Sequence, residues 1–280
     1  MSKVVSDQAD GLRRLMAQHA GANPVRVFAL VGSTPAVGAT SVALNLAAAL
    51  AQQGQDVLLL EEKSGPQSAS AVWQINTGGS WSDVAAQRLP LQAAAGRAAC
   101  GVWVLPAAGS ADQTDVRSVF QGQIVLIDAS LDRNGALSPL AAQADEVIVV
   151  LRPQAASITA GYACIKQLHY AHALQQLRIM LNLATDANEA QRVLNNLVGT
   201  GSRYLALALE PAGCVVDDPR LAHAQRLGLS VVEAFQTSPA AIDFRRIAAD
   251  LLQWPWRARV PNKQASPVGV SQPQRVLQPS

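Results

Sequence analysis

The chain alternates between short runs of apolar, β-branched residues and longer stretches rich in alanine and leucine, starting at Val25. The short runs are apolar along almost their whole length, which is typical of strands that are buried on both faces of a parallel sheet. Alternation of such strands with helices favours a sheet that is covered by helices on both sides. The sequence therefore predicts an α/β fold with a doubly wound, mostly parallel sheet.

The same pattern divides the chain into three parts. Residues 1–24 form an N-terminal segment, 25–256 an α/β domain, and 257–280 a polar, proline-bearing tail that is predicted to be disordered. The region 64–100 is rich in glycine, serine, alanine and glutamine, and no pattern places its elements. Strands are expected at 25–31, 56–61, 101–106, 123–128, 146–151, 177–182 and near 205–216, and helices at 39–53, 157–173, 186–198, 219–227 and 239–253.

Composition and charge narrow the classes of protein. Hydrophobic residues make up 49% of the chain and charged residues 15%, so the chain can bury a core. The net charge is +2, but the tail has four basic and no acidic residues, which leaves 18 basic and 20 acidic residues, or −2, on the rest. A strongly basic body is disfavoured, and no nucleic-acid partner is expected. The first twenty residues lack the apolar core of a signal peptide, which favours a cytoplasmic location.

The turn after the first expected strand resembles a phosphate-binding loop with parts missing. It has the sequence GSTPAVGATS over 32–41. A working P-loop, G-x-x-x-x-G-K-[ST], uses glycines so that backbone amides can wrap phosphates, a lysine for the β/γ oxygens and a hydroxyl for Mg²⁺. In that register Ser33 stands at the first glycine, Gly38 at the second, Ala39 at the lysine and Thr40 at the hydroxyl. Taken alone, this is a weak match.

Neighbouring segments strengthen the match. The segment VFALVGSTPAVGATSVALNLAAALAQQGQDVLLLE resembles the opening of the MinD/ParA family of deviant P-loop ATPases, in which KGGVGKT precedes a helix with an N-L-A-x-x-L-A core. The segments ADEVIVVLRPQAASITAGYACIKQL, RIMLN and VVDDPRLAHAQRLGLSVVEAFQTSPAAIDFRRIA are similar to later parts of that family, in the same order. The resemblance covers about residues 25–253 and implies a MinD-like P-loop fold.

The resemblance implies ATP and Mg²⁺ as cofactors, but the charged positions depart from the family. Thr34 stands where the family has its signature lysine, which reaches the partner's phosphate across a dimer, and Ala39 replaces the P-loop lysine. The loss of a charge-assisted phosphate contact removes about 1.5–3 kcal/mol. Pro35 and Ala36 replace paired glycines, so close approach of an anion is hindered. Weak or lost nucleotide binding is expected, and a nucleotide-dependent homodimer is disfavoured.

Several positions allow a functional and a structural interpretation. The resemblance assigns Thr40 and Ser41 to Mg²⁺, but a helix cap is slightly favoured. Asp128 is either the Walker B carboxylate or a strand-end loop cap, and these alternatives stay open. Asn182, at the adenine-contacting position, and Asp217-Asp218 after it could be turn formers. The residues that the resemblance assigns to the nucleotide are Ser33, Gly38, Ala39, Thr40, Ser41, Asp128 and Asn182, with Thr40 and Asp128 as the Mg²⁺ ligands.

The loop after the second strand also departs from the family. Glu61-Glu62-Lys63 occupies the place of a D-x-D motif, which puts Lys63 at the second aspartate, the one that aids water activation. A cation cannot serve as that base. Lys63 either compensates for the lost P-loop lysine near a phosphate or is a solvated loop charge, and the second interpretation is favoured.

A short amphipathic helix is expected over residues 6–20. Its sequence DQADGLR resembles the D-Q-A-x-x-L-R motif of flagellar-number regulators of the FlhG/FleN type, whose N-terminal helix stimulates a flagellar GTPase of the signal-recognition-particle type. The alternative is a helix that packs on the body and has no preference for glutamine. The partner-binding residues that the resemblance implies are Asp7, Gln8, Ala9, Leu12 and Arg13.

The last expected helix carries an apolar stripe. In MinD relatives a C-terminal amphipathic segment binds the membrane, and Trp254, Trp256, Arg257 and Arg259 would suit a lipid interface. A stripe of this spacing is more often the core face of a packed helix, which is the favoured interpretation. The stripe comprises Ala241, Phe244, Ile247, Ala248, Leu251 and Leu252.

The leading hypothesis is a regulator of flagellar number or placement that binds a flagellar GTPase and other flagellar or regulatory proteins, with little or no ATPase activity. It would be cytoplasmic, with peripheral contact at the inner membrane or cell pole as an option. One alternative is an active ATP switch of the MinD type that binds the membrane. Another is a ParA-like DNA-positioning protein, against which the charge of the body counts.

Overall fold

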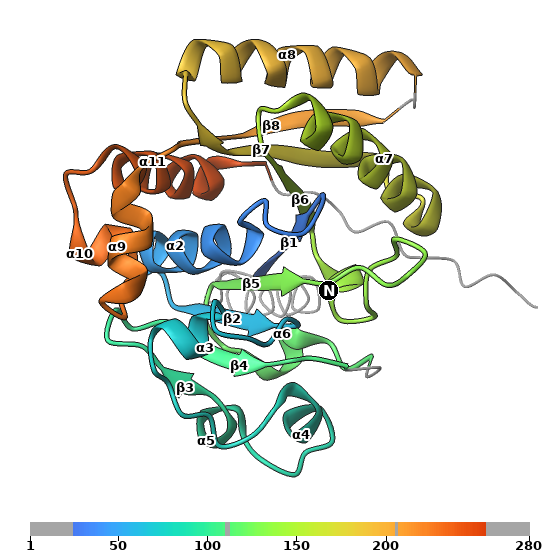
Figure 1. Cartoon of the computed structure of the whole chain (residues 1–280). Helices are drawn as coiled ribbons and strands as arrows, with labels where there is room; N and C mark the ends of the chain where they lie inside the picture. Colours follow the sequence, from blue (N-terminus) through green and yellow to red (C-terminus); the bar gives the residue numbers. More distant parts are fainter. Residues whose placement is uncertain (1–24, 110–112, 205–206, 256–280) are drawn as a thin grey trace, which may run out of the picture.

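The computed structural model describes residues 25–109, 113–204 and 207–255, and these form a sheet with helices on both sides (Figure 1). The expected helix over 6–20, with the partner-binding residues 7–13, and the expected tail over 257–280 lie outside the described residues. Within the described part, eight strands are ordered β3-β4-β2-β5-β1-β6-β7-β8. All neighbours are parallel except β3 and β4. The predicted doubly wound, mostly parallel sheet is confirmed.

The expected strands form close to their predicted bounds, while the unplaced region 64–100 contains short elements. The strands are β1 (Arg26–Gly32), β2 (Val57–Glu61), β3 (Gly96–Arg97), β4 (Trp103–Pro106), β5 (Ile124–Ala129), β6 (Glu146–Leu151), β7 (Gln176–Ala184) and β8 (Ala208–Val216). The longer helices are α2 (Ala39–Gln52), α7 (Ala155–His172), α8 (Ala187–Tyr204), α9 (Pro219–Arg226) and α11 (Pro239–Gln253). The short ones are α3 (Ala69–Val72), α4 (Trp81–Ala85), α5 (Leu91–Ala94), α6 (Val116–Val119), the 3-10 turn η1 (Ala141–Gln143) and α10 (Val231–Ala234).

Successive residues of the central strand enter two different cores. Phe28 and Leu30 belong to the core on the side of α2, α3 and α9–α11, whereas Val27, Ala29 and Val31 belong to the core that includes α4–α8. All five are almost completely buried. Because strand side chains alternate between faces, a strand covered on both sides is apolar at every position. This is the reason for the continuous apolar runs in the sequence.

The apolar stripe of α11 is a core face. Phe244 is 1% exposed, and the stripe packs in the same core as α2. The guanidinium carbon of Arg178 lies 3.8 Å from the ring centroid of Trp254, and Phe28 makes an edge contact with the same ring. The favoured interpretation is confirmed, and this stripe is unavailable as a lipid-binding face. Of the helices in the described residues, none has the length and apolar content required to cross a bilayer.

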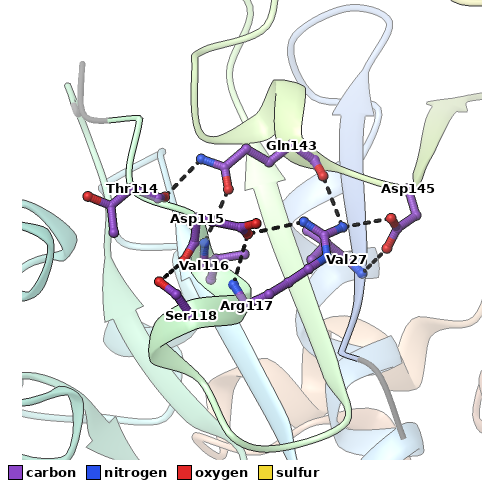
Figure 2. Close-up of polar contacts among 8 residues, drawn as sticks. All are labelled: Val27, Thr114, Asp115, Val116, Arg117, Ser118, Gln143 and Asp145. Atoms are coloured by element: carbon purple, nitrogen blue, oxygen red, sulfur yellow. Dashed lines mark hydrogen bonds and ion pairs between the residues drawn. The ribbon is translucent and has the colours of Figure 1, made fainter. Parts of the chain in front are cut away.

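A network of hydrogen bonds and ion pairs connects α6 to the start of β1 and to the segment before β6 (Figure 2). Asp145, just before β6, accepts from Val27 N at 2.8 Å and from Arg117 Nη2 at 2.6 Å. Arg117 also donates to Gln143 O, and the side chain of Gln143 bonds the backbone at Thr114 and Val116. Val27 is the second residue of β1, so this network lies at the opposite end of that strand from the turn after Gly32.

Substitutions on the buried and exposed sides of α11 should lower the free energy of unfolding by different amounts. Replacement of Phe244 by Ala removes a fully buried ring and should lower the free energy of unfolding by about 3–5 kcal/mol. Ile242 on the same helix is 51% exposed, so Ile242→Ala is the matched control and should cost far less. Urea denaturation of the full-length variants measures both. Equal losses would contradict the assignment of the buried face.

Candidate functional site

The strand order brings several polar segments to one edge of the sheet. β1 lies between β5 and β6, and the path of the chain reverses direction across the sheet at this point (Figure 1). In open α/β sheets, ligand sites form at the carboxyl ends of the strands at such a position. The turn 33–38 after β1, Asp128 in β5 and Arg152 after β6 meet there. Lys63 follows β2, the neighbour of β5, and joins the same edge.

The turn 33–38 has a constrained backbone. Ala36 has φ +64° and Gly38 has φ +89°, both in the left-handed region that favours glycine. Gly38 is the N-cap of α2, and no side chain caps this helix. Thr40 and Ser41 therefore occupy the second and third helical positions, and the favoured interpretation of these two hydroxyls as caps is wrong. Ser33 N donates to Val150 O at 3.0 Å, which joins the turn to β6.

Asn182 reaches the turn from the far side of β6. It lies in β7, is 3% exposed, and donates through Nδ2 to Val37 O at 2.9 Å. A Cβ built on Gly38 would lie 2.4 Å from the same Nδ2 atom, so a side chain at this position would displace the Asn182 amide and would strain the backbone, whose φ is +89°. Asn182 thus contacts the turn after β1, and its side chain is not a local turn former. Whether it contacts an adenine stays a prediction.

Asp218 has a structural role. Its Oδ1 accepts from Arg220 N at 2.9 Å, which caps α9, and its Oδ2 accepts from Ala240 N at 3.2 Å near the start of α11. One buried carboxylate thus satisfies amide donors of two helices, as a cap should. This contact agrees with the turn-former interpretation.

Lys63 forms an ion pair with Asp128. The distance from Nζ to Asp128 Oδ1 is 2.8 Å, and the side chains are 35% and 2% exposed, respectively. The interpretation of Lys63 as a solvated loop charge is therefore wrong, because its ammonium neutralises a buried carboxylate. The other oxygen, Asp128 Oδ2, and Ser33 Oγ are buried without a hydrogen-bond partner among the described residues.

Two further carboxylates lie beside this pair. Glu61 is opposite Asp128 in the parallel register and accepts from Ser70 N at 3.1 Å. Burial raises the pKa of Glu61, and the negative charge of Asp128 raises it further. Glu62 accepts from Ser130 N at 2.8 Å and from the Ser138 hydroxyl, and burial raises its pKa as well. The edge is rich in carboxylates, a poor environment for a polyphosphate.

Arg152 is a site residue that the sequence analysis missed. It directly follows β6, and its Nη2 atom donates to Ala36 O at 2.7 Å. Its place in the sequence, directly after an expected strand, could have indicated that it belongs to the site. A cation that follows the strand adjacent to β1 ends beside the β1 turn, because the carboxyl ends of neighbouring parallel strands lie together. Arg152 and Asn182 thus hold successive carbonyls of the turn, those of Ala36 and Val37.

The residues present fit a magnesium nucleotide poorly. Position 39 supplies no cation, and the Lys63 ammonium lies on Asp128, the carboxylate expected to help hold Mg²⁺. Metal binding there would bring a divalent cation next to an ammonium, which is electrostatically unfavourable. The polar groups of a P-loop are placed at this edge, but their charges differ from those that MgATP requires.

The sequence and the fold of this chain are similar to those of known proteins. No family model matches the chain. The antiactivator FleN of Pseudomonas aeruginosa is 27% identical over 254 residues, which cover 86% of this chain and 91% of FleN. An uncharacterized ATP-binding protein of Methanocaldococcus jannaschii is 26% identical over 255 residues, which cover 85% of this chain and 92% of that protein. The MinD cell division protein of Aquifex aeolicus has the same fold, with a TM-score of 0.67, 18% identity and coverage of 84% of this chain and 100% of that chain.

The chain has the fold of MinD and ParA ATPases. Its sequence is similar to that of the antiactivator FleN along most of both chains. The resemblance drawn from the sequence is confirmed on both counts.

The close approach of Gly38 to Asn182 can be tested with a matched pair of glycines. Gly54 also has a positive φ of +82°, but nothing lies within 4 Å of its added Cβ, so Gly54→Ala should cost only the backbone strain of about 1–2 kcal/mol. Gly38→Ala should cost more, because the methyl group displaces the Asn182 amide. Thermal or urea unfolding gives both values.

A double variant separates the backbone strain at position 38 from the steric clash with Asn182. Asn182→Ala should make Gly38→Ala less costly than it is alone, so the two changes should be clearly non-additive. Additive effects would refute the contact between these residues.

Proposed function

We propose that this chain is a FleN-like regulator of flagellar number or placement that works by binding other proteins, with weak or absent ATPase activity. Similarity to the antiactivator FleN along most of both chains supports the regulatory role. An antiactivator restrains an activator, so a regulatory protein is a fitting partner for the body. The observation that carries the loss of ATP turnover is the 2.8 Å ion pair between Lys63 and Asp128.

The charges at this edge of the sheet are unsuited to phosphoryl transfer. Phosphoryl transfer depends on cations at the β and γ phosphates and on a carboxylate that is free to help hold Mg²⁺. Here Ala39 replaces the P-loop cation, and Asp128 is already paired with a lysine. Lys63 is also unable to accept a proton from an attacking water. Each change lowers affinity for MgATP or removes part of the hydrolytic machinery.

Nucleotide titration tests this part of the proposal. The full-length chain with a fluorescent ATP analogue and Mg²⁺ should show no saturable binding up to millimolar nucleotide, and no turnover in the same sample. The ATP-binding relative from Methanocaldococcus jannaschii serves as the positive control for the assay. Micromolar binding with turnover would instead establish the alternative of an active ATP switch.

The N-terminal segment provides the second part. We propose that the segment Asp7–Arg13 engages a flagellar GTPase of the signal-recognition-particle type, with Gln8 acting at the partner's active site. Gln8→Ala in the full-length chain should abolish stimulation of GTP hydrolysis by that GTPase. Gln18→Ala, a glutamine of the same segment outside the motif, should stimulate like the unchanged chain.

The outcome of this comparison decides between the two interpretations of the segment. Stimulation by the Gln8→Ala variant at the unchanged level would favour a helix that packs on the body. A role in DNA positioning has no structural observation in its favour, and the charge of −2 on residues 1–256 argues against it.

A further inference from the structure

Two loops at the candidate site are joined by a dense set of contacts. We call residues 62–68, which follow β2, the β2 loop, and residues 130–138, which follow β5, the β5 loop. Glu62 connects them through its carboxylate, which accepts from Ser130 N at 2.8 Å and from the Ser138 hydroxyl. The Ser130 hydroxyl also lies 3.4 Å from Glu62 O. Because the residues in contact are 68 and 76 positions apart, these contacts fix the relative position of the two loops.

Two buried carboxylates lie next to each other where the β2 loop and the β5 loop begin. Glu61 and Asp128 are neighbours in the register of β2 and β5, and they are 4% and 1% exposed. Two carboxylates at this depth repel each other, and each would be costly to bury without a cation. Lys63 supplies that cation from the β2 loop, and Glu62 N donates to Asp128 O at 3.2 Å beside it.

Within the part of the chain that the structure describes, one oxygen of Asp128 has no hydrogen-bond partner. Lys63 contacts Oδ1, while Oδ2 is buried without a hydrogen-bond partner among the described residues. A lysine provides one point charge and three donors, and here one donor reaches the carboxylate. The carboxylate thus keeps an unused oxygen next to the position that the ammonium occupies, and this arrangement could accept a metal ion if the lysine were absent.

We propose that the Lys63 ammonium takes the place of a divalent cation at Asp128 and holds the β2 loop and the β5 loop together without nucleotide. The inference rests on the proposed function, because it explains how a chain that has lost ATP turnover keeps these loops in one arrangement. A surface that these loops present to a protein partner is then available whether or not nucleotide is bound. Its regulation must come from partner binding or from the amount of protein.

Hydrogen–deuterium exchange of the full-length chain without nucleotide tests the proposal. Lys63→Met keeps the aliphatic stem and removes the charge, so peptides from both loops should exchange several-fold faster than in the unchanged chain. Arg133→Met is the matched control, because Arg133 is an exposed cation of the β5 loop. It should leave the β2 loop unaffected. Lys63→Arg should retain most of the protection.

The same exchange measurement in millimolar Mg²⁺ tests whether the ammonium replaces a divalent cation. Mg²⁺ should slow exchange of both loops in Lys63→Met, since Asp128 can then bind the ion. It should have no effect on the unchanged chain or on the double variant Lys63→Met/Asp128→Asn. Circular dichroism confirms that each variant is folded.

Three results would overturn the proposal: unchanged exchange in Lys63→Met, faster exchange that Mg²⁺ does not reverse, and slower exchange of the unchanged chain in Mg²⁺. These readouts require no nucleotide. The proposed role of Lys63 in holding the two loops can therefore be refuted while the chain still lacks ATPase activity, and ATP turnover can be found while Lys63 holds the loops.

Discussion

The parallel pairing of β1 with β5 on one side and β6 on the other is the constraint on which the rest of the structure depends. Parallel connections place helices over both faces of the sheet, so that both faces of β1 are buried and its sequence is apolar at successive positions. The pairing also aligns the carboxyl ends of three strands, so that Asp128 and Arg152 flank the turn after Gly32. The site is thus a direct product of strand order, and its contacts join residues that are 65, 116 and 145 positions apart.

Sequence reasoning succeeded where a local pattern carries the information. Continuous apolar strands and long helices have such patterns. The four- and five-residue helices of 69–94 are too short to show a period, so they could not be placed. The role of Lys63 failed for another reason. Its partner lies 65 residues away, and only the pairing of β2 with β5 brings the two charges together.

The expected caps at Thr40 and Ser41 failed because a glycine in the left-handed conformation starts α2 in their place. The turn after β1 has positive φ angles at Ala36 and Gly38 and lies close to Asn182. The ammonium at this edge comes from Lys63 and is paired with Asp128. Geometry and charge are independent properties of such a site.

The two ends of β1 have different surroundings. At the start, Val27 is held by Asp145, and the N-terminal segment joins the domain next to it at Val25. At the other end lies the turn that Arg152 and Asn182 hold. The seven residues of β1 separate these points by roughly 20 Å, at a rise of about 3.3 Å per residue. The N-terminal segment therefore joins the domain at the end of β1 that lies away from the candidate site, and the length of the strand separates the two.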